Sequence, residues 1–109
     1  MAEVIFTAEA VRDIEEIHAY IAQDSVRYAD RQVRLFYEEA ERLAFFPRGG
    51  RMVPEVQHFT VRELIIGNYR MMYRLLEPEV VEVMIIHHAK RRFPFGRIQP
   101  GGSTRTRRK

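Results

Sequence analysis

The sequence predicts an α+β domain: a short N-terminal strand and an antiparallel helical hairpin packed on a mostly antiparallel sheet. Three observations carry this prediction: a β-rich run at the start, two amphipathic helical segments behind it, and three strand-like runs in the second half. The expected order of elements is β-α-α-β-β-β. With 109 residues, 46% of them hydrophobic, the chain can build one core but not two.

The first half predicts one strand and two helices. Residues 3–7 form the β-rich run, and the Thr7 hydroxyl can cap the helix behind it. The hydrophobic stripe of that helix consists of Ala10, Val11, Ile14, Ile17 and Ile21. After a break at residues 23–25, where Asp24 or Ser25 offers a new N-cap, a second stripe consists of Ala29, Val33, Phe36, Ala40 and Leu43. The connector is so short that the two helices must lie antiparallel.

The second half predicts an antiparallel meander. Pro47 and the following glycines end the second helix near Phe46, and residues 47–58 are expected to form a loop. Strands are expected at 59–66, 69–76 and 80–88, separated by turns at Gly67-Asn68 and at residues 77–79. The last run is apolar on both faces apart from Glu82, which is typical of a central strand covered on both sides.

The middle strand of this meander alternates between two kinds of side chain. The face expected to meet the helices consists of Tyr69, Met71, Tyr73 and Leu75. Arg70 and Arg74 are then expected to point to the open side of the sheet.

Charge is divided unevenly along the chain. Residues 1–46 carry five basic and ten acidic side chains, and residues 47–109 carry thirteen and five, within a net charge of +3. This division favours an anionic partner for the second half, either nucleic acid or an acidic protein segment. The alternative is that the two halves attract each other. Residues 96–109 carry five basic side chains and no acidic ones, so we expect a domain at 1–95 and a disordered basic tail at 96–109.

Composition also excludes several classes of protein. The absence of cysteine excludes disulfides and Cys-based zinc sites, and no run is long enough for a membrane span. The N-terminus has no signal-peptide pattern, so a cytoplasmic location is expected. No metal-binding motif and no cofactor motif is found, and neither a nucleophile elbow nor a Ser/His/Asp set is present.

The candidate site is a group of cationic residues on or beside the predicted sheet. Arginine outnumbers lysine sixteen to two, and its planar guanidinium suits phosphate or carboxylate. The group consists of Arg62, Arg70, Arg74, Lys90, Arg91 and Arg92. The alternative for each arginine is an ion pair with a strand neighbour such as Glu63 or Glu82. Phe93 and Phe95 could stack on bases or fill a partner's pocket, or they could close the bottom of the core.

Two histidines end the last predicted strand beside this group. His87 or His88 could act as a general acid or base in phosphodiester cleavage. As neighbours on a strand they should point to opposite faces, so they could not easily chelate one metal together. The alternative for each is a half-buried histidine bonded to the backbone.

These motifs together resemble the RelE/ParE superfamily of bacterial type II toxins. The matching segments are A-x-x-D-I-x-x-I-x-x-Y-I-A at 10–22, G-R-x-x-P-E at 50–55, R-E-L at 62–64, Y-R-x-x-Y-R at 69–74 and H-A-K-R-R-F-P at 88–94. The resemblance implies one of two activities. ParE-like members inhibit DNA gyrase, whereas RelE-like members cut mRNA in the ribosomal A site without a metal.

The residues favour the first activity. Arg70 and Arg91 match arginines that RelE-like members use on the scissile phosphate, with His88 as a further candidate, but no tyrosine follows Tyr73 where those members often carry one. The ending H-A-K-R-R-F-P is similar to that of many ParE-like chains. We therefore expect a ParE-like gyrase inhibitor; the alternatives are a RelE-like mRNA interferase and a non-enzymatic nucleic-acid-binding module or inactive toxin relic.

The resemblance also implies partners and a contact surface. A cognate antitoxin with an acidic C-terminal segment would cover the basic face, in a complex expected to be a higher oligomer. The target would be DNA gyrase, or alternatively the ribosome and mRNA, and no cofactor or metal is expected. The residues expected to bind the target are Arg62, Arg70, Arg74, Lys90, Arg91, Arg92 and Phe93.

Overall fold

The computed structural model describes residues 1–98, which fold into two helices on a five-stranded sheet. The elements in chain order are β1 (Glu3–Phe6), α1 (Ala8–Ala22), α2 (Val26–Arg42), β2 (Arg51–Met52), β3 (Val61–Ile66), β4 (Tyr69–Leu76), β5 (Val80–His88) and a 3₁₀ helix, η1 (Phe95–Arg97). The predicted α+β fold and its order of long elements are confirmed.

The sheet has the strand order β1-β5-β4-β3-β2. The pairs β2–β3, β3–β4 and β4–β5 are antiparallel, and β1 runs parallel to β5. The predicted meander is therefore present, with β5 as an inner strand buried on both faces. The two-residue strand β2 lies in the region expected to be a loop, and it forms the edge beside β3.

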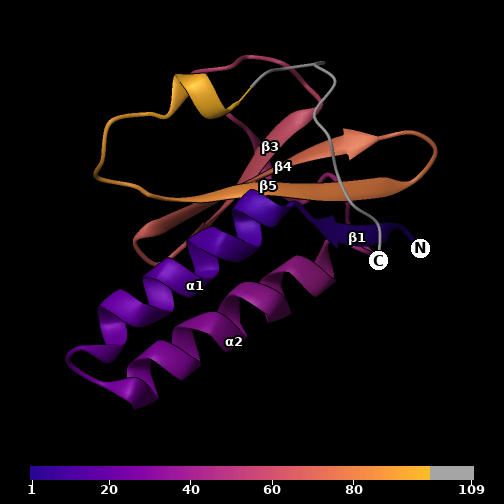
Figure 1. Cartoon of the computed structure of the whole chain (residues 1–109). Helices are drawn as coiled ribbons and strands as arrows, with labels where there is room; N and C mark the ends of the chain where they lie inside the picture. Colours follow the sequence, from indigo (N-terminus) through magenta and orange to yellow (C-terminus); the bar gives the residue numbers. More distant parts are fainter. Residues whose placement is uncertain (99–109) are drawn as a thin grey trace.

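The helical hairpin covers one face of the sheet (Figure 1). Thr7 and Ser25 are the N-caps of the two helices, and their hydroxyl oxygens accept hydrogen bonds from Ala10 N and Tyr28 N. Buried residues of both helices pack against Met71 and Tyr73 of β4, with Tyr69 and Leu75 partly buried beside them. The face predicted to meet the helices is thus confirmed.

The opposite face of the sheet is not open, and this corrects the prediction for Arg70 and Arg74. A second hydrophobic cluster covers it, built from Val53, Val61, Met72, Met84, Ile85 and Ile98, with Val56 and Phe93 packed against them. Figure 1 shows η1 on this side of the sheet, with the helical hairpin on the other side. Both arginines point to this face but are buried there, with 8% and 3% of their surfaces exposed.

A bulge in β5 changes which of the two hydrophobic clusters its successive side chains join. Met72 pairs with Ile85 and Tyr73 with Val83, which leaves Met84 without a partner on β4. Consequently Met84 and Ile85, although adjacent, both belong to the second cluster, whereas Val83 and Ile86 pack toward the helices.

The packed part of the chain continues past residue 95. Ile98 is 5% exposed within the second cluster, and the Arg97 guanidinium donates to Glu9 at 3.0 Å and to Asp13 at 3.0 and 3.2 Å. Residues 97 and 98 therefore contact the domain that precedes them. The disordered tail predicted at 96–109 includes these ordered residues, and its remaining residues 99–109 lie outside the described part of the chain.

Candidate functional site

Three consecutive cations stand exposed just after β5. Lys90, Arg91 and Arg92 are all exposed. Two backbone hydrogen bonds fix the start of the segment that carries them. Ala89 N donates to Asn68 O at 2.7 Å, and Arg91 N donates to His88 O at 3.1 Å. The basic run (residues 90–92) is therefore presented to solvent by a short, anchored turn at the end of the sheet.

The two histidines at the end of β5 brace this turn. His87 Nε2 donates to Arg91 O at 3.2 Å, and His88 Nδ1 accepts from Lys90 N at 3.1 Å. His87 pairs with Arg70 across the sheet and His88 with Tyr69, so the two lie on opposite faces as predicted. Both are half-buried. The geometry matches the expectation of histidines bonded to backbone.

Arg70 lies beneath this turn in a buried ion-pair network. Its Nε donates to Glu63 Oε1 at 2.6 Å and its NH2 donates to Glu63 Oε2 at 3.2 Å. NH2 and NH1 also donate to the two carboxylate oxygens of Glu55, at 2.7 and 3.1 Å. The Arg70 side chain is only 10% exposed, and the Glu63 side chain is 0% exposed.

Both partners of Arg70 influence its protonation. The hydrogen bond with Glu55 is the largest cause that raises the pKa of Arg70, and Glu63 adds to it. In return, the hydrogen bond from Arg70 lowers the pKa of Glu55. The Arg70–Glu55 ion pair therefore persists at neutral pH.

The same network fixes the segment that begins with Gly50. Arg51 Nε donates to Glu63 Oε2 at 2.7 Å, and Gly50 N donates to the Tyr73 hydroxyl at 2.9 Å. A Cβ at position 50 would lie 2.4 Å from Glu63 O, so the close approach needs glycine. Arg62 also serves this segment, because its NH1 donates to Gly50 O at 2.9 Å. The structure thus gives Arg62 a partly buried, structural contact.

Arg74 lies at the other end of β4, four residues from Arg70 or roughly 13 Å along the strand. Its Nε is 4.0 Å from Glu82 Oε1, and its NH2 is 3.4 Å from the Met84 sulfur. Burial raises the pKa of Glu82, and the charge of Arg74 opposes that rise. This buried pair is separate from the exposed basic run, so the structure does not bring all six predicted cations around one anion.

Phe93 joins the basic run to the Arg70 network. The Arg70 guanidinium lies 5.2 Å from the centre of the Phe93 ring, and the Phe95 ring meets Phe93 edge-on at 4.6 Å. Phe93 is half-buried against the second cluster, whereas Phe95 is 64% exposed. The expectation that these rings close a core fits Phe93, and Phe95 faces solvent.

Sequence reasoning gave no role to several residues that shape the site. In the sequence Glu55 is only the end of the G-R-x-x-P-E motif. Asp13 and Arg97 lie 84 residues apart, so their contact emerges only in the fold. Asp13 also accepts a hydrogen bond from Ile86 N on the part of β5 that β1 does not reach. Burial is the largest influence on the pKa of Asp13 and raises it, while the hydrogen bonds from Ile86 and Arg97 oppose the rise.

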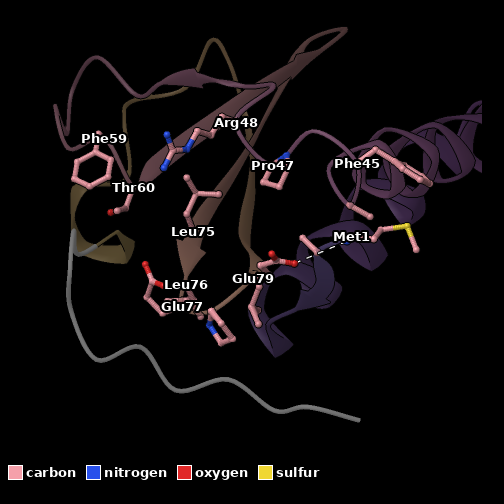
Figure 2. Close-up of a pocket in the computed structure, with 14 residues that line it drawn as sticks. Met1, Phe45, Pro47, Arg48, Phe59, Thr60, Leu75, Leu76, Glu77 and Glu79 are labelled. Carbon is pink, nitrogen blue, oxygen red and sulfur yellow. Dashed lines mark ion pairs between the residues drawn. The ribbon is translucent and has the colours of Figure 1, made fainter.

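A hollow of about 410 Å³ lies at the opposite end of the sheet, by the β4–β5 turn (Figure 2). Its walls include Phe45, Phe59 and Leu76, and Glu79 forms an ion pair with the N-terminal amine at 3.8 Å. None of the predicted site residues lines it. Within residues 1–98 no group of three or more His, Asp or Glu side chains is arranged to hold a metal ion, and no helix is long and apolar enough to cross a membrane.

Comparison with known proteins agrees with this geometry. The family model described as the ParE toxin of the type II toxin–antitoxin system parDE matches residues 4–93. Toxin RelE2 of Caulobacter vibrioides is 31% identical over 91 residues, which cover 84% of this chain and 99% of that protein.

Solved structures show the same fold. A chain of the chromosomal ParDE system from P. aeruginosa has a TM-score of 0.68 at 19% identity and covers 83% of this chain and 98% of its own. The RelBE2 toxin–antitoxin complex from Mycobacterium tuberculosis gives 0.57 at 22% identity, covering 80% and 96%. A mutant of E. coli toxin RelE in the free state gives 0.57 at 14%, covering 83% and 86%. The family match over residues 4–93 is the decisive finding: this chain belongs to the ParE toxin family, within the RelE/ParE superfamily of type II toxin–antitoxin toxins.

Proposed function

We propose that this toxin acts on DNA gyrase and does not cut mRNA. The main support is that all three guanidinium nitrogens of Arg70 already donate hydrogen bonds within the protein: Nε, NH1 and NH2 donate to Glu55 or Glu63. A nuclease needs cationic donors aimed at the charge that develops on the phosphate. A guanidinium already bound to two carboxylates cannot supply that charge without losing an internal ion pair.

The exposed basic run is the proposed target-contacting surface. Lys90, Arg91 and Arg92 are exposed, unlike Arg70 and Arg74. Their backbone is anchored by His87 and His88, so the side chains are presented from a rigid base. In this proposal Arg62, Arg70 and Arg74 stabilise the fold, and Phe93 supports the run from below.

The proposal includes a cognate antitoxin with an acidic segment. Two of the structural neighbours are described as ParDE and RelBE2 toxin–antitoxin systems, and the second half of this chain is strongly basic. An acidic segment laid on the basic run would neutralise it and block access to the target.

Supercoiling of relaxed plasmid by purified gyrase tests the proposal. The expected result is inhibition that increases with toxin concentration and is reversed when antitoxin is added. Unaffected supercoiling by a preparation that still arrests growth would exclude gyrase as the target.

A RelE-like mRNA interferase is the second candidate. It is favoured by the 31% identity to a protein named Toxin RelE2 and by the position of His88 beside the exposed Arg91. Cleavage of ribosome-bound mRNA that is lost in His88→Ala and Arg91→Ala would support this candidate. Cleavage that survives both changes would show that these residues are not its catalytic groups.

A further inference from the structure

Glu55 occupies the outer edge of the Arg70 guanidinium. Its two carboxylate oxygens accept from NH2 at 2.7 Å and from NH1 at 3.1 Å. Two parallel contacts of this kind are also how arginine binds a phosphate group. The Glu55 carboxylate therefore sits where a phosphate oxygen pair would bind.

The other contacts around Arg70 would favour the binding of an anion at its outer edge. Glu63 binds the inner edge of Arg70, and Arg51 offsets the charge of Glu63 from the other side at 2.7 Å. The Phe93 ring covers one face of the guanidinium. Without Glu55, these contacts would still orient Arg70, and its outer edge would face water.

Glu55 differs from Glu63 in its exposure. The Glu55 side chain is 33% exposed and projects from the turn between β2 and β3, whereas the Glu63 side chain is fully buried in the sheet. Arg70 holds the pKa of Glu55 below its ordinary value, so the carboxylate stays charged and repels other anions. Glu63 therefore holds the Arg70 side chain in place, and Glu55 occupies the edge of Arg70 that an anion could otherwise bind.

We infer that Glu55 is the specificity-determining residue of this sheet face: it acts as the chain's own ligand for Arg70 and excludes nucleic-acid phosphate. The exposed basic run lies next to this position, because Arg70 pairs with His87 and His87 binds Arg91. An accessible Arg70 would extend that run into a phosphate-binding surface. The inference does not depend on gyrase being the target.

Binding of a labelled oligouridylate to the full-length protein tests this role. Glu55→Ala is compared with Glu79→Ala, which removes the same charge from a side chain that is 70% exposed in the β4–β5 turn. We expect Glu55→Ala to bind on the order of tenfold more tightly than Glu79→Ala at low salt, because one charge-assisted contact is gained. Its log–log salt dependence should be steeper by about 0.7, the value for one additional single-strand phosphate contact.

A second substitution assigns the gain to Arg70. In the double variant Glu55→Ala/Arg70→Met the gain should disappear, although the basic run is intact. Glu55→Gln, which keeps the size of the side chain, should show the same gain over Glu79→Gln. Equal binding by the Glu55 and Glu79 variants, or a gain that persists without Arg70, would overturn the inference.

Discussion

At the scale of single residues, one guanidinium connects three sequence motifs. Glu55 ends G-R-x-x-P-E, Glu63 is the central residue of R-E-L, and Arg70 belongs to Y-R-x-x-Y-R. A buried carboxylate such as that of Glu63 is tolerated only when it is paired and hydrogen-bonded. The three motifs therefore describe one ion-pair network that holds the segment after α2 against the sheet.

Arg70→Met should destabilise the fold by about 3 kcal/mol, since removal of one member of a buried pair leaves the other charge uncompensated. Urea denaturation followed by circular dichroism measures this change. Arg91→Ala is the control, and it should change the free energy of unfolding by less than about 0.5 kcal/mol because Arg91 is exposed. Equal stabilities of the two variants would show that the network contributes nothing.

Gly50→Ala should cost about 1–3 kcal/mol, the usual range for forcing an extra methyl group into a packed site. The new Cβ would lie 2.4 Å from Glu63 O and 2.8 Å from the Tyr73 hydroxyl. Gly96→Ala is the matched control, because no atom of residues 1–98 lies within 4 Å of a Cβ there. Thermal melts of the two variants give the comparison, and a melting temperature for Gly50→Ala equal to that of Gly96→Ala would refute it.

Much of the network could not be predicted from the sequence. The sequence shows that Arg70, Glu63 and the basic run are charged, and it leaves open the pairing of a sheet arginine with Glu63. Which arginine is buried depends on the second cluster and on contacts such as Glu55–Arg70, between residues 15 positions apart. Charge and period alone do not reveal whether the second face of a sheet is covered.

At the scale of elements, Thr7 links the start of α1 to the bulge in β5. Its hydroxyl group accepts from Ala10 N at 3.0 Å and donates to Met84 O at 2.7 Å. Met84 is the bulged residue, so the cap stabilises the position where β5 changes register. One buried hydroxyl group thus forms hydrogen bonds with both the helix layer and the sheet.

Thr7→Val should destabilise the protein by about 2 kcal/mol, because it removes a helix cap and leaves a buried carbonyl without its donor. Thr7→Ser retains the hydroxyl and should recover most of that loss. Ser25→Ala at the other N-cap, whose hydroxyl makes only the bond to Tyr28 N among the described residues, should cost only about 1 kcal/mol. Guanidinium denaturation would contradict this role if Thr7→Val were no less stable than Ser25→Ala.

Long elements could be predicted from the sequence because their patterns are local. Both helices and the three strands of the meander follow from hydrophobic periodicity and from turn residues such as Gly67, whose φ is +60°. β2 has two residues and η1 has three, too few for any periodicity. Both β2 and η1 are held by contacts between residues separated in the sequence, Arg51 with Glu63 and Arg97 with Asp13.

At the scale of the whole molecule, acidic and basic side chains are concentrated on different elements of the fold. The two helices carry most of the acidic residues, and the basic run follows the last strand at one end of the sheet. A concentrated cationic surface accelerates encounter with an anionic partner and makes binding dependent on salt. This effect belongs to the exposed cations, since the buried Arg70 is paired with Glu55 and Glu63 and the buried Arg74 lies beside Glu82.

The triple variant Lys90→Ala/Arg91→Ala/Arg92→Ala should lose gyrase inhibition by on the order of tenfold or more, with a weaker dependence on salt. The control is Arg27→Ala/Arg31→Ala/Arg34→Ala, which removes three equal charges from exposed positions of α2. Both variants should unfold like the parent protein, because none of these six side chains is buried. Supercoiling assays at two salt concentrations separate local from global charge: if both triple variants lose inhibition equally, net charge alone explains the effect, and the basic run is not the contact surface.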